Sequence, residues 1–379
     1  MNSAAHSSPR MLTLILLAAL STLSLNLFLP SLPNIARDFQ ADYALVSLSI
    51  AGYLAVTAVL QLVIGPMSDR FGRKPVLLCA LSVFVVGSMG CLLATDIYSF
   101  LLFRALQAAV ISGWVLSMAI APMLGPMVGG LLDEFFGWRS SFLLYCLFGA
   151  VMLLWCWLDL AETNLSPSAT FAAQFRAYPH LLSSRRFWGF AVCALFSTGT
   201  FYVFLAGVPL VAARQFAISP GELGFYMGTI TAGFAVGSFL AGRYSRRHAL
   251  TTMMIAGRLV ACTGLAAGLI AFLLGYAHGL TLFVATIFAG LGNGISMPSA
   301  NSGAISIRPG LAGSAAGLLG ASSVSGGALL TTLSGYLLEQ GDAAISLLGI
   351  MLACAVIALL AAVYVRVIDE RAALVSAGV

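Results

Sequence analysis

The chain has 379 residues, of which 60% are hydrophobic and only 8% are charged, and its mean hydropathy is +1.00. Soluble domains carry roughly 25% charged residues, so these values exclude a soluble globular protein and indicate an integral membrane protein. The net charge of +5 does not indicate nucleic-acid binding, because the basic residues lie in short loops between apolar runs, a pattern typical of membrane orientation.

The first apolar run covers residues 11–29 and follows a single arginine, Arg10. It leads into Pro30-Ser31-Leu32-Pro33 without a small-x-small cleavage site, so we interpret it as an uncleaved first helix rather than a signal peptide. A helix needs about 20 residues to cross the bilayer core. Nine further runs meet that length: 44–64, 76–95, 140–158, 187–210, 221–241, 249–275, 279–300, 311–337 and 343–365.

A ten-residue turn, 65–74, is predicted between the apolar runs 44–64 and 76–95. It reads Gly65-Pro66-Met67-Ser68-Asp69-Arg70-Phe71-Gly72-Arg73-Lys74. Its glycines permit a tight connection. Its three basic residues place it in the cytoplasm, because cytoplasmic loops of membrane proteins are enriched in Lys and Arg.

The run 99–132 is too long for one span and too short for two spans with a loop, and Arg104 is its only charge. If it crosses twice, all the basic loops of the chain share one side of the membrane. We therefore expect a shortened helical hairpin that turns near Gly113–Met118, and twelve passes in total. A single crossing, with eleven passes, is the alternative.

The segment 159–186 is the only long polar stretch, so it divides the chain into two sets of six passes. We expect an all-α protein with an N-terminal bundle (1–158), a cytoplasmic linker (159–186) and a C-terminal bundle (187–379). Both termini are then cytoplasmic. Two six-helix repeats of this kind are known in transporters.

Three motifs connect the chain with a known family. The 65–74 turn reads G-x-x-x-D-R-x-G-R-K and resembles the loop between helices 2 and 3 of major facilitator transporters. Residues 121–130, APMLGPMVGG, resemble helix 5 of the drug–proton antiporters in that superfamily. With Phe28-Leu29-Pro30-Ser31-Leu32-Pro33 added, the chain is similar to multidrug exporters of the bicyclomycin/chloramphenicol-resistance type, most strongly before residue 140.

The resemblance implies the major facilitator fold, with two pseudo-symmetric helical bundles. It also implies efflux of small amphipathic compounds by proton antiport and alternating access, in the bacterial inner membrane. The expected partners are a small-molecule substrate, protons and the lipid bilayer, and we expect a monomer with no cofactor, no metal and no enzyme activity. Two alternatives stay open: an exporter of a small polar metabolite such as an amino acid or sugar, and a transport-impaired deletion variant, because the helix 4 and helix 5 motifs run together near Ser117.

In the family, the turn motif closes the cytoplasmic side in one state of the transport cycle. The matching residues are Gly65, Asp69, Arg70, Gly72, Arg73 and Lys74. The helix 5 motif combines two prolines, which kink a helix, with glycines that let helices approach closely. Its residues are Pro122, Gly125, Pro126, Gly129 and Gly130.

Proton coupling requires a titratable group, yet no acid lies near the middle of any predicted span. Arg104 and Gln107 match an R-x-x-Q pattern of helix 4 that the family uses in coupling. The candidate acids at helix ends are Asp133, Glu134 and Glu222. The alternative for Arg104 is that its side chain snorkels to the outer surface.

Polar and amphipathic side chains within apolar helices are candidates for the substrate cavity, because such cavities combine apolar walls with a few polar groups. They are Asn26, Tyr53, Gln61, Gln107, Trp114, Tyr202 and Asn293. Relatives often carry an acid in helix 1, where this chain has Asn26. A cavity with so few charges favours uncharged or cationic drug-like substrates. The seven cysteines all lie in apolar runs and form no CxxC pattern, which argues against a metal or redox site.

Overall fold

The computed structural model describes residues 11–108, 120–160, 178–307, 312–339 and 342–376, and these residues form helices without a strand. The prediction of an all-α fold is therefore confirmed. The predicted hairpin turn near Gly113–Met118 and most of the 159–186 linker lie outside the described residues.

The described N-terminal half has six longer helices, and two short helical elements connect the first of them to the second. Its elements are α1 (Met11–Asn26), the 3₁₀ turn η1 (Leu29–Ser31), α2 (Leu32–Asp38), α3 (Tyr43–Phe71), α4 (Arg73–Leu93), α5 (Ile97–Gln107), α6 (Ile120–Phe136) and α7 (Arg139–Asp159). The C-terminal half has six long helices after the short α9 (Tyr178–Leu182). They are α10 (Arg185–Gln215), α11 (Pro220–Tyr244), α12 (Leu250–Leu273), α13 (Gly279–Ser306), α14 (Ala312–Glu339) and α15 (Ala343–Ser376).

Nine of the described helices are long and apolar enough to cross a membrane. These are α3, α4 and α7 in the N-terminal half, and α10 to α15 in the C-terminal half. A polar residue fixes where the shorter apolar helix α5 begins. Asp96 accepts from the backbone N–H groups of Tyr98 and Ser99 at the start of α5, and such caps satisfy donors that have no partner within the helix.

The turn between α3 and α4 is much shorter than the sequence pattern predicts. Helix α3 continues to Phe71 and α4 starts at Arg73, so Gly72 alone separates them. Gly72 has φ 92°, a conformation that residues with a side chain rarely adopt. The prediction of a ten-residue turn is therefore wrong: one glycine is enough to reverse the chain, and residues 65–71 extend the helix.

The start of α5 and the end of α6 lie at the same end of the N-terminal half. Arg139, which follows α6, donates to Asp38 at 2.7 Å and to the carbonyl of Ala94, just before α5, at 3.1 Å. The rings of Phe100 and Trp138 lie 5.7 Å apart. A single crossing would place the start of α5 and the end of α6 at opposite ends, so the structure favours the predicted double pass. We call this end of the molecule the Asp38 end, and the opposite end the Gly72 end.

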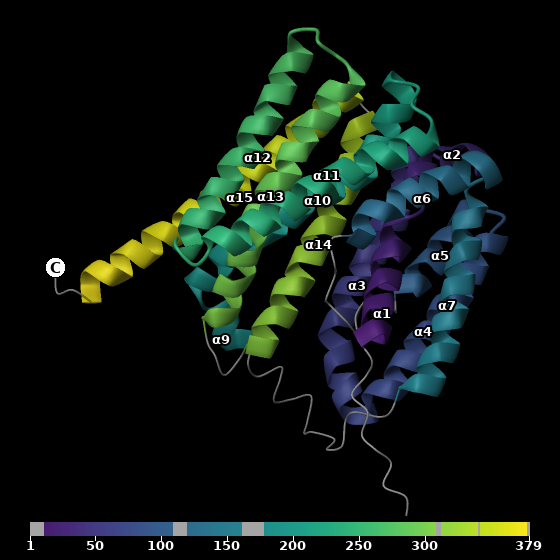
Figure 1. Ribbon diagram of the computed structural model, residues 1–379, viewed down its shortest axis with the longest axis horizontal. Coiled ribbons are helices and arrows are strands. Elements are labelled where there is room, and N and C mark those ends of the chain that lie inside the picture. The colour runs from purple at the N-terminus through teal and green to yellow at the C-terminus, as the bar shows by residue number, and fades with distance from the viewer. Residues whose placement is uncertain (1–10, 109–119, 161–177, 308–311, 340–341, 377–379) are drawn as a thin grey trace, which may run out of the picture.

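The two halves lie beside each other, and the pairs α3–α14 and α6–α11 join them (Figure 1). Four hydrogen bonds connect described residues of the two halves, and all four lie at the Asp38 end. Among them, the Tyr43 hydroxyl donates to the carbonyl of Ala206 at 2.6 Å, and the backbone N–H of Ala44 donates to Glu339 at 3.0 Å.

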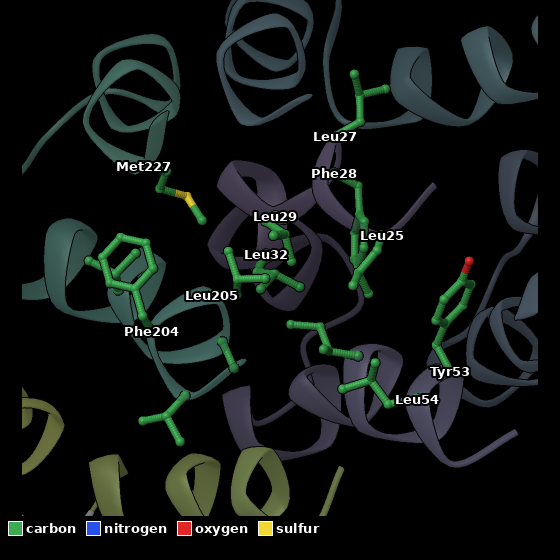
Figure 2. Packing of buried hydrophobic residues seen from close by; sticks show 14 of the residues in the cluster. Leu25, Leu27, Phe28, Leu29, Leu32, Tyr53, Leu54, Phe204, Leu205 and Met227 are labelled. Atoms are coloured by element: carbon green, nitrogen blue, oxygen red, sulfur yellow. The ribbon is translucent and has the colours of Figure 1, made fainter. Parts of the chain in front are cut away.

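An apolar core continues across this junction. Leu29 and Leu32 in the η1–α2 segment lie near Phe204 and Leu205 of α10 and Met227 of α11 (Figure 2). All five side chains are buried. Burial of apolar surface between the halves thus stabilises their contact at the Asp38 end.

Candidate functional site

Arg104 lies in the last turn of α5 and is completely buried. Its guanidinium carbon lies 4.2 Å from the ring centre of Phe28 and 4.6 Å from that of Tyr53, so two aromatic faces stabilise the cation. Its Nη1 donates to the carbonyl of Ser24 at 3.2 Å and to Oε1 of Gln107. The side chain therefore points into the helix bundle, and the snorkelling alternative is wrong.

Two of the predicted cavity residues belong to the surroundings of this arginine. Gln107 donates through Nε2 to the hydroxyl of Ser88 on α4 at 2.7 Å. The hydroxyls of Tyr53 and Ser24 share a hydrogen bond of 2.6 Å, and Figure 2 shows the Tyr53 ring beside the α1–η1 segment. The network therefore ties α1, α3, α4 and α5 together around one buried positive charge.

The other predicted cavity residues are distributed over both halves. Asn26 donates to the carbonyl of Thr22 in its own helix at 2.8 Å. An added Cβ at Gly320 of α14 would lie 3.0 Å from Oε1 of Gln61, which places Gln61 at the α3–α14 junction. Tyr202 packs in the same way against α14. Trp114 lies outside the described residues.

The C-terminal half contains a second buried arginine network that the sequence analysis missed. Arg258 of α12 is completely buried, and its Nη2 donates to Oδ1 of Asn293 on α13 at 2.7 Å. Asn293 in turn donates to the carbonyl of Ser197 on α10 at 3.0 Å. A signal for it was present: Arg258 is the only charge inside the apolar run 249–275, and such residues are usually functional.

The two networks occupy equivalent positions in the two halves. The first, third and fourth long helices are α1, α4 and α5 in one half, and α10, α12 and α13 in the other. In both halves, a serine carbonyl of the first helix accepts a hydrogen bond, and an amide side chain of the fourth helix bonds to a buried arginine. Two details differ: the helix that carries the arginine, and the donor to the serine carbonyl, which is Arg104 in one half and Asn293 in the other. This repeat is detectable in the structure and not in the sequence spacing.

The three candidate acids have different environments. Asp133 is 6% exposed and accepts a hydrogen bond of 2.6 Å from Nδ2 of Asn34. Arg37 donates to the other end of the same amide, Oδ1 of Asn34, at 2.8 Å. Of the three acids, Asp133 is the only buried one. It lines a cleft of about 660 Å³ at the Asp38 end, together with Asn34, Arg37, Asp38, Gln40, Gly137, Trp138 and Arg139.

Glu134 and Glu222 are exposed and bind the start of α11. Oε2 of Glu134 accepts from the backbone N–H of Gly221 at 3.0 Å, across the junction of the halves. Glu222 forms a capping box with Ser219. Both carboxylates therefore satisfy backbone donors at a helix N-terminus, where negative charge is favoured.

Asp38 marks the solvent-facing rim of the same cleft. It forms an ion pair with Arg139 at 2.7 Å, in which both side chains are almost half exposed. The hydrogen bond from Arg139 lowers the pKa of Asp38 below its usual value, because it favours the charged carboxylate.

The helix 5 motif residues lie where α6 meets α1 and α11. A Cβ added at Gly130 would lie 2.9 Å from the carbonyl carbon of Pro220, and one at Gly224 would lie 2.8 Å from that of Pro126. Gly125 and Gly129 approach α1 at Asn26 and Leu27 in the same way. The backbones of α6 and α11 thus touch directly. The side chain of Pro122 lies outside the described part of the chain.

Of the predicted 65–74 motif, the structure describes Gly72 and Lys74. Lys74 donates through Nζ to the carbonyl of Trp157 on α7 at 3.0 Å. The side chains of Asp69, Arg70 and Arg73 and the surroundings of Gly65 lie outside the described positions. The closing role of this motif therefore stays a prediction.

A model of the Major Facilitator Superfamily matches residues 14–121, 107–257 and 191–378. An uncharacterised transporter of this type from Bacillus subtilis, YdgK, is 31% identical over 64% of this chain and 69% of its own length. Multidrug resistance protein D of Escherichia coli is 27% identical over 89% of this chain and 91% of its own.

The fold is similar to that of solved transporters. A bacterial homologue of the human lysosomal transporter Spinster, solved in an inward-facing and occupied conformation, superposes with a TM-score of 0.74. The superposition covers 95% of this chain and 96% of the other, at 17% sequence identity.

Proposed function

Because the chain belongs to the Major Facilitator Superfamily and is a multi-pass membrane transporter rather than an enzyme, we propose that it exports small amphipathic compounds in exchange for protons. The likeness to Multidrug resistance protein D supports drug-like substrates. We further propose that the protein lies in the bacterial inner membrane as a monomer, with the Gly72 end and both termini in the cytoplasm. In this orientation, bundles 1–158 and 187–379 are joined by the cytoplasmic linker 159–186.

The mechanism is alternating access, in which the two halves separate first at one end and then at the other. The contacts at the Asp38 end support it, because the four hydrogen bonds and the glycine contacts between α6 and α11 join the halves there. A compound from the cytoplasmic side would bind between the halves while this end is closed. Separation of α6 from α11 would then open the path to the outside.

The proposed proton-exchange group is Asp133, and its burial on α6, beside the junction with α11, is the observation on which the proposal rests. It lies one residue before Glu134, which bonds to α11, and it accepts a hydrogen bond from the neutral Asn34. In the closed arrangement the carboxyl group lines the cleft at the Asp38 end and is 6% exposed; we propose that separation of α6 from α11 increases its access to water. A group whose access changes with the conformation can exchange protons with one side at a time. Arg104 lies near the same segment, since Phe28 contacts it and Asn34 contacts Asp133.

The proposal is tested with inverted membrane vesicles that contain the full chain and an imposed pH gradient. Wild type is expected to accumulate a drug such as chloramphenicol only while the gradient lasts. Asp133→Asn should abolish gradient-driven accumulation and retain drug binding. Glu222→Gln, which alters a helix cap only, is the matched control and should retain transport.

Three results would contradict this proposal. Gradient-driven transport by Asp133→Asn would exclude Asp133 as the coupling group. Accumulation of no compound by the wild type, with the protein correctly inserted, would favour the transport-impaired variant. Transport of amino acids or sugars in place of drugs would favour the metabolite exporter.

A further inference from the structure

Arg258 carries a buried positive charge that forms no ion pair with an acid in the described part of the chain. It is 0% exposed and lies in the interior of α12. Its hydrogen-bond partner, Asn293, is neutral. The nitrogen atoms Nε and Nη1 have no hydrogen-bond partner among the described residues.

The sequence around Arg258 and in the helices that follow it is poor in acids. No Asp or Glu occurs between Glu222 and Glu339, or between Asp342 and Asp369. Each of these four acids lies at or near the end of a helix, whereas Arg258 lies within the span. An unpaired charge inside a membrane protein costs several kcal/mol and typically marks a ligand or ion pathway.

The arginine is held firmly in place. The residues directly before Arg258 and Asn293 are Gly257 and Gly292, and they lie at a close contact of α12 and α13. A Cβ at Gly257 would be 2.9 Å from the Cβ of Ser296, and one at Gly292 would be 2.8 Å from that of Ala261. The bond to Asn293 uses Nη2, so Nε and Nη1 are left to bind another group.

We propose that Arg258, positioned by Asn293, binds the anionic group of the exported compound in the C-terminal half. This inference rests on the proposed export function and narrows its substrate class. The substrates are neutral or anionic amphipaths, such as hydrophobic carboxylates, and lipophilic cations are disfavoured. The sequence alone favoured uncharged or cationic substrates; the two buried guanidinium groups, Arg104 and Arg258, argue against cations because like charges repel in an interior of low dielectric constant.

The test measures equilibrium binding to the purified full chain in lipid nanodiscs. The probes are dansylglycine, an amphipathic carboxylate, and its methyl ester, which has the same ring system without the charge. Hydrogen bonds to charged groups contribute about 1.5–3 kcal/mol, so wild type should bind the carboxylate about 10- to 100-fold more tightly than the ester. Arg258→Met should lose this preference with unchanged ester affinity, and Arg258→Lys should keep part of it.

The matched control is Arg243→Gln, which removes a positive charge from an exposed position on α11 and should bind as wild type does. Equal affinity of wild type for ester and carboxylate would overturn the proposal. If Arg258→Met does not fold, the proposal is still tested by the ratio of carboxylate to ester affinity in wild type and by the same ratio in Arg258→Lys.

A second arm replaces gluconate with chloride in the buffer. Competition between chloride and dansylglycine in wild type, absent in Arg258→Met, supports one shared anion site. Stabilisation by chloride with dansylglycine affinity unaffected by Arg258→Met would assign the site to an inorganic ion and overturn its role in substrate binding. Binding is measured without a proton gradient, so failure of proton-driven export and failure of anion binding are separate results.

Discussion

The direct contact between α6 and α11 predicts that one added methyl group will open the Asp38 end of the molecule. The Cβ of Gly224→Ala would overlap the carbonyl oxygen of Pro126. It would also lie 2.8 Å from the carbonyl carbon of Pro126 and 3.0 Å from Cα of Met127, where ordinary contacts begin at 3.4 Å. The neighbours are backbone atoms, which no change of rotamer can move. The two helices must therefore separate by at least about 0.6 Å.

The free-energy cost falls on one conformation only. Overpacking of this kind costs about 1–3 kcal/mol. The closed arrangement of the Asp38 end needs the contact, whereas an arrangement with α6 and α11 apart does not. Gly224→Ala should therefore shift the equilibrium towards the open arrangement by about 5- to 150-fold.

The assay is the distance between spin labels at Gln40 and Tyr276, two exposed residues at the Asp38 end of different halves. The described cysteines are free, so a cysteine-free background removes no disulfide among them. Gly224→Ala should add a population at longer distance. The control is Gly242→Ala near the other end of α11, where a Cβ meets nothing within 4 Å. Both variants gain helix propensity, by about 1 kcal/mol, so their difference isolates the overlap.

Two outcomes would refute this reasoning. One is an unchanged distance distribution in Gly224→Ala. The other is an equal shift in Gly224→Ala and Gly242→Ala, which would show that helix propensity and not the overlap controls the closed state.

Three further variants test other features. Gly72→Ala should lower the thermal unfolding midpoint, because φ 92° costs a residue with a side chain about 1–2 kcal/mol; Gly52→Ala, in open space on α3, should not. Arg139 lowers the pKa of Asp38, so this ion pair stabilises the protein above about pH 4, and the stabilisation is lost as pH falls through the lowered pKa. Asp38→Asn should abolish this part of the acid dependence, which urea unfolding at pH 3 and pH 6 measures. The expected difference is below about 1 kcal/mol, because the pair is so exposed. Arg104→Lys keeps the positive charge but loses the planar guanidinium that stacks between the rings of Phe28 and Tyr53, so drug efflux should fall about tenfold or more at equal expression. Unchanged efflux would exclude a functional role for the planar shape of the guanidinium.

Membrane class, helix positions and the double pass could be predicted from the sequence, because they depend on apolar length and loop charge. The loop charges placed the start of α5 and the end of α6 on the same side, and the contacts of Arg139 agree. The turn at Gly72 could not be predicted correctly. A cluster of Gly, Pro and charged residues is typical of a loop, yet in this chain a single glycine with positive φ makes the reversal.

The candidate site was predictable only in part, because side-chain partners come from distant helices. Arg104 was singled out correctly as an intramembrane charge, but its burial between Phe28 and Tyr53 depends on the packing of α1, α3 and α5. The sequence did not distinguish between Asp133, Glu134 and Glu222 as candidates for proton coupling. Only the structure separates the buried carboxyl group of Asp133 from the two that cap α11.

The buried charge of Arg104 has a consequence for how the protein is made. A permanently charged arginine costs about 2.5–3.5 kcal/mol at the centre of an inserted helix. A helix with such a charge enters lipid at lower cost when other groups of the protein receive the charge. For Arg104 these groups include the rings of Phe28 and Tyr53 and the carbonyl of Ser24. All three precede α5 in the chain, so they have been synthesised before Arg104 reaches the membrane.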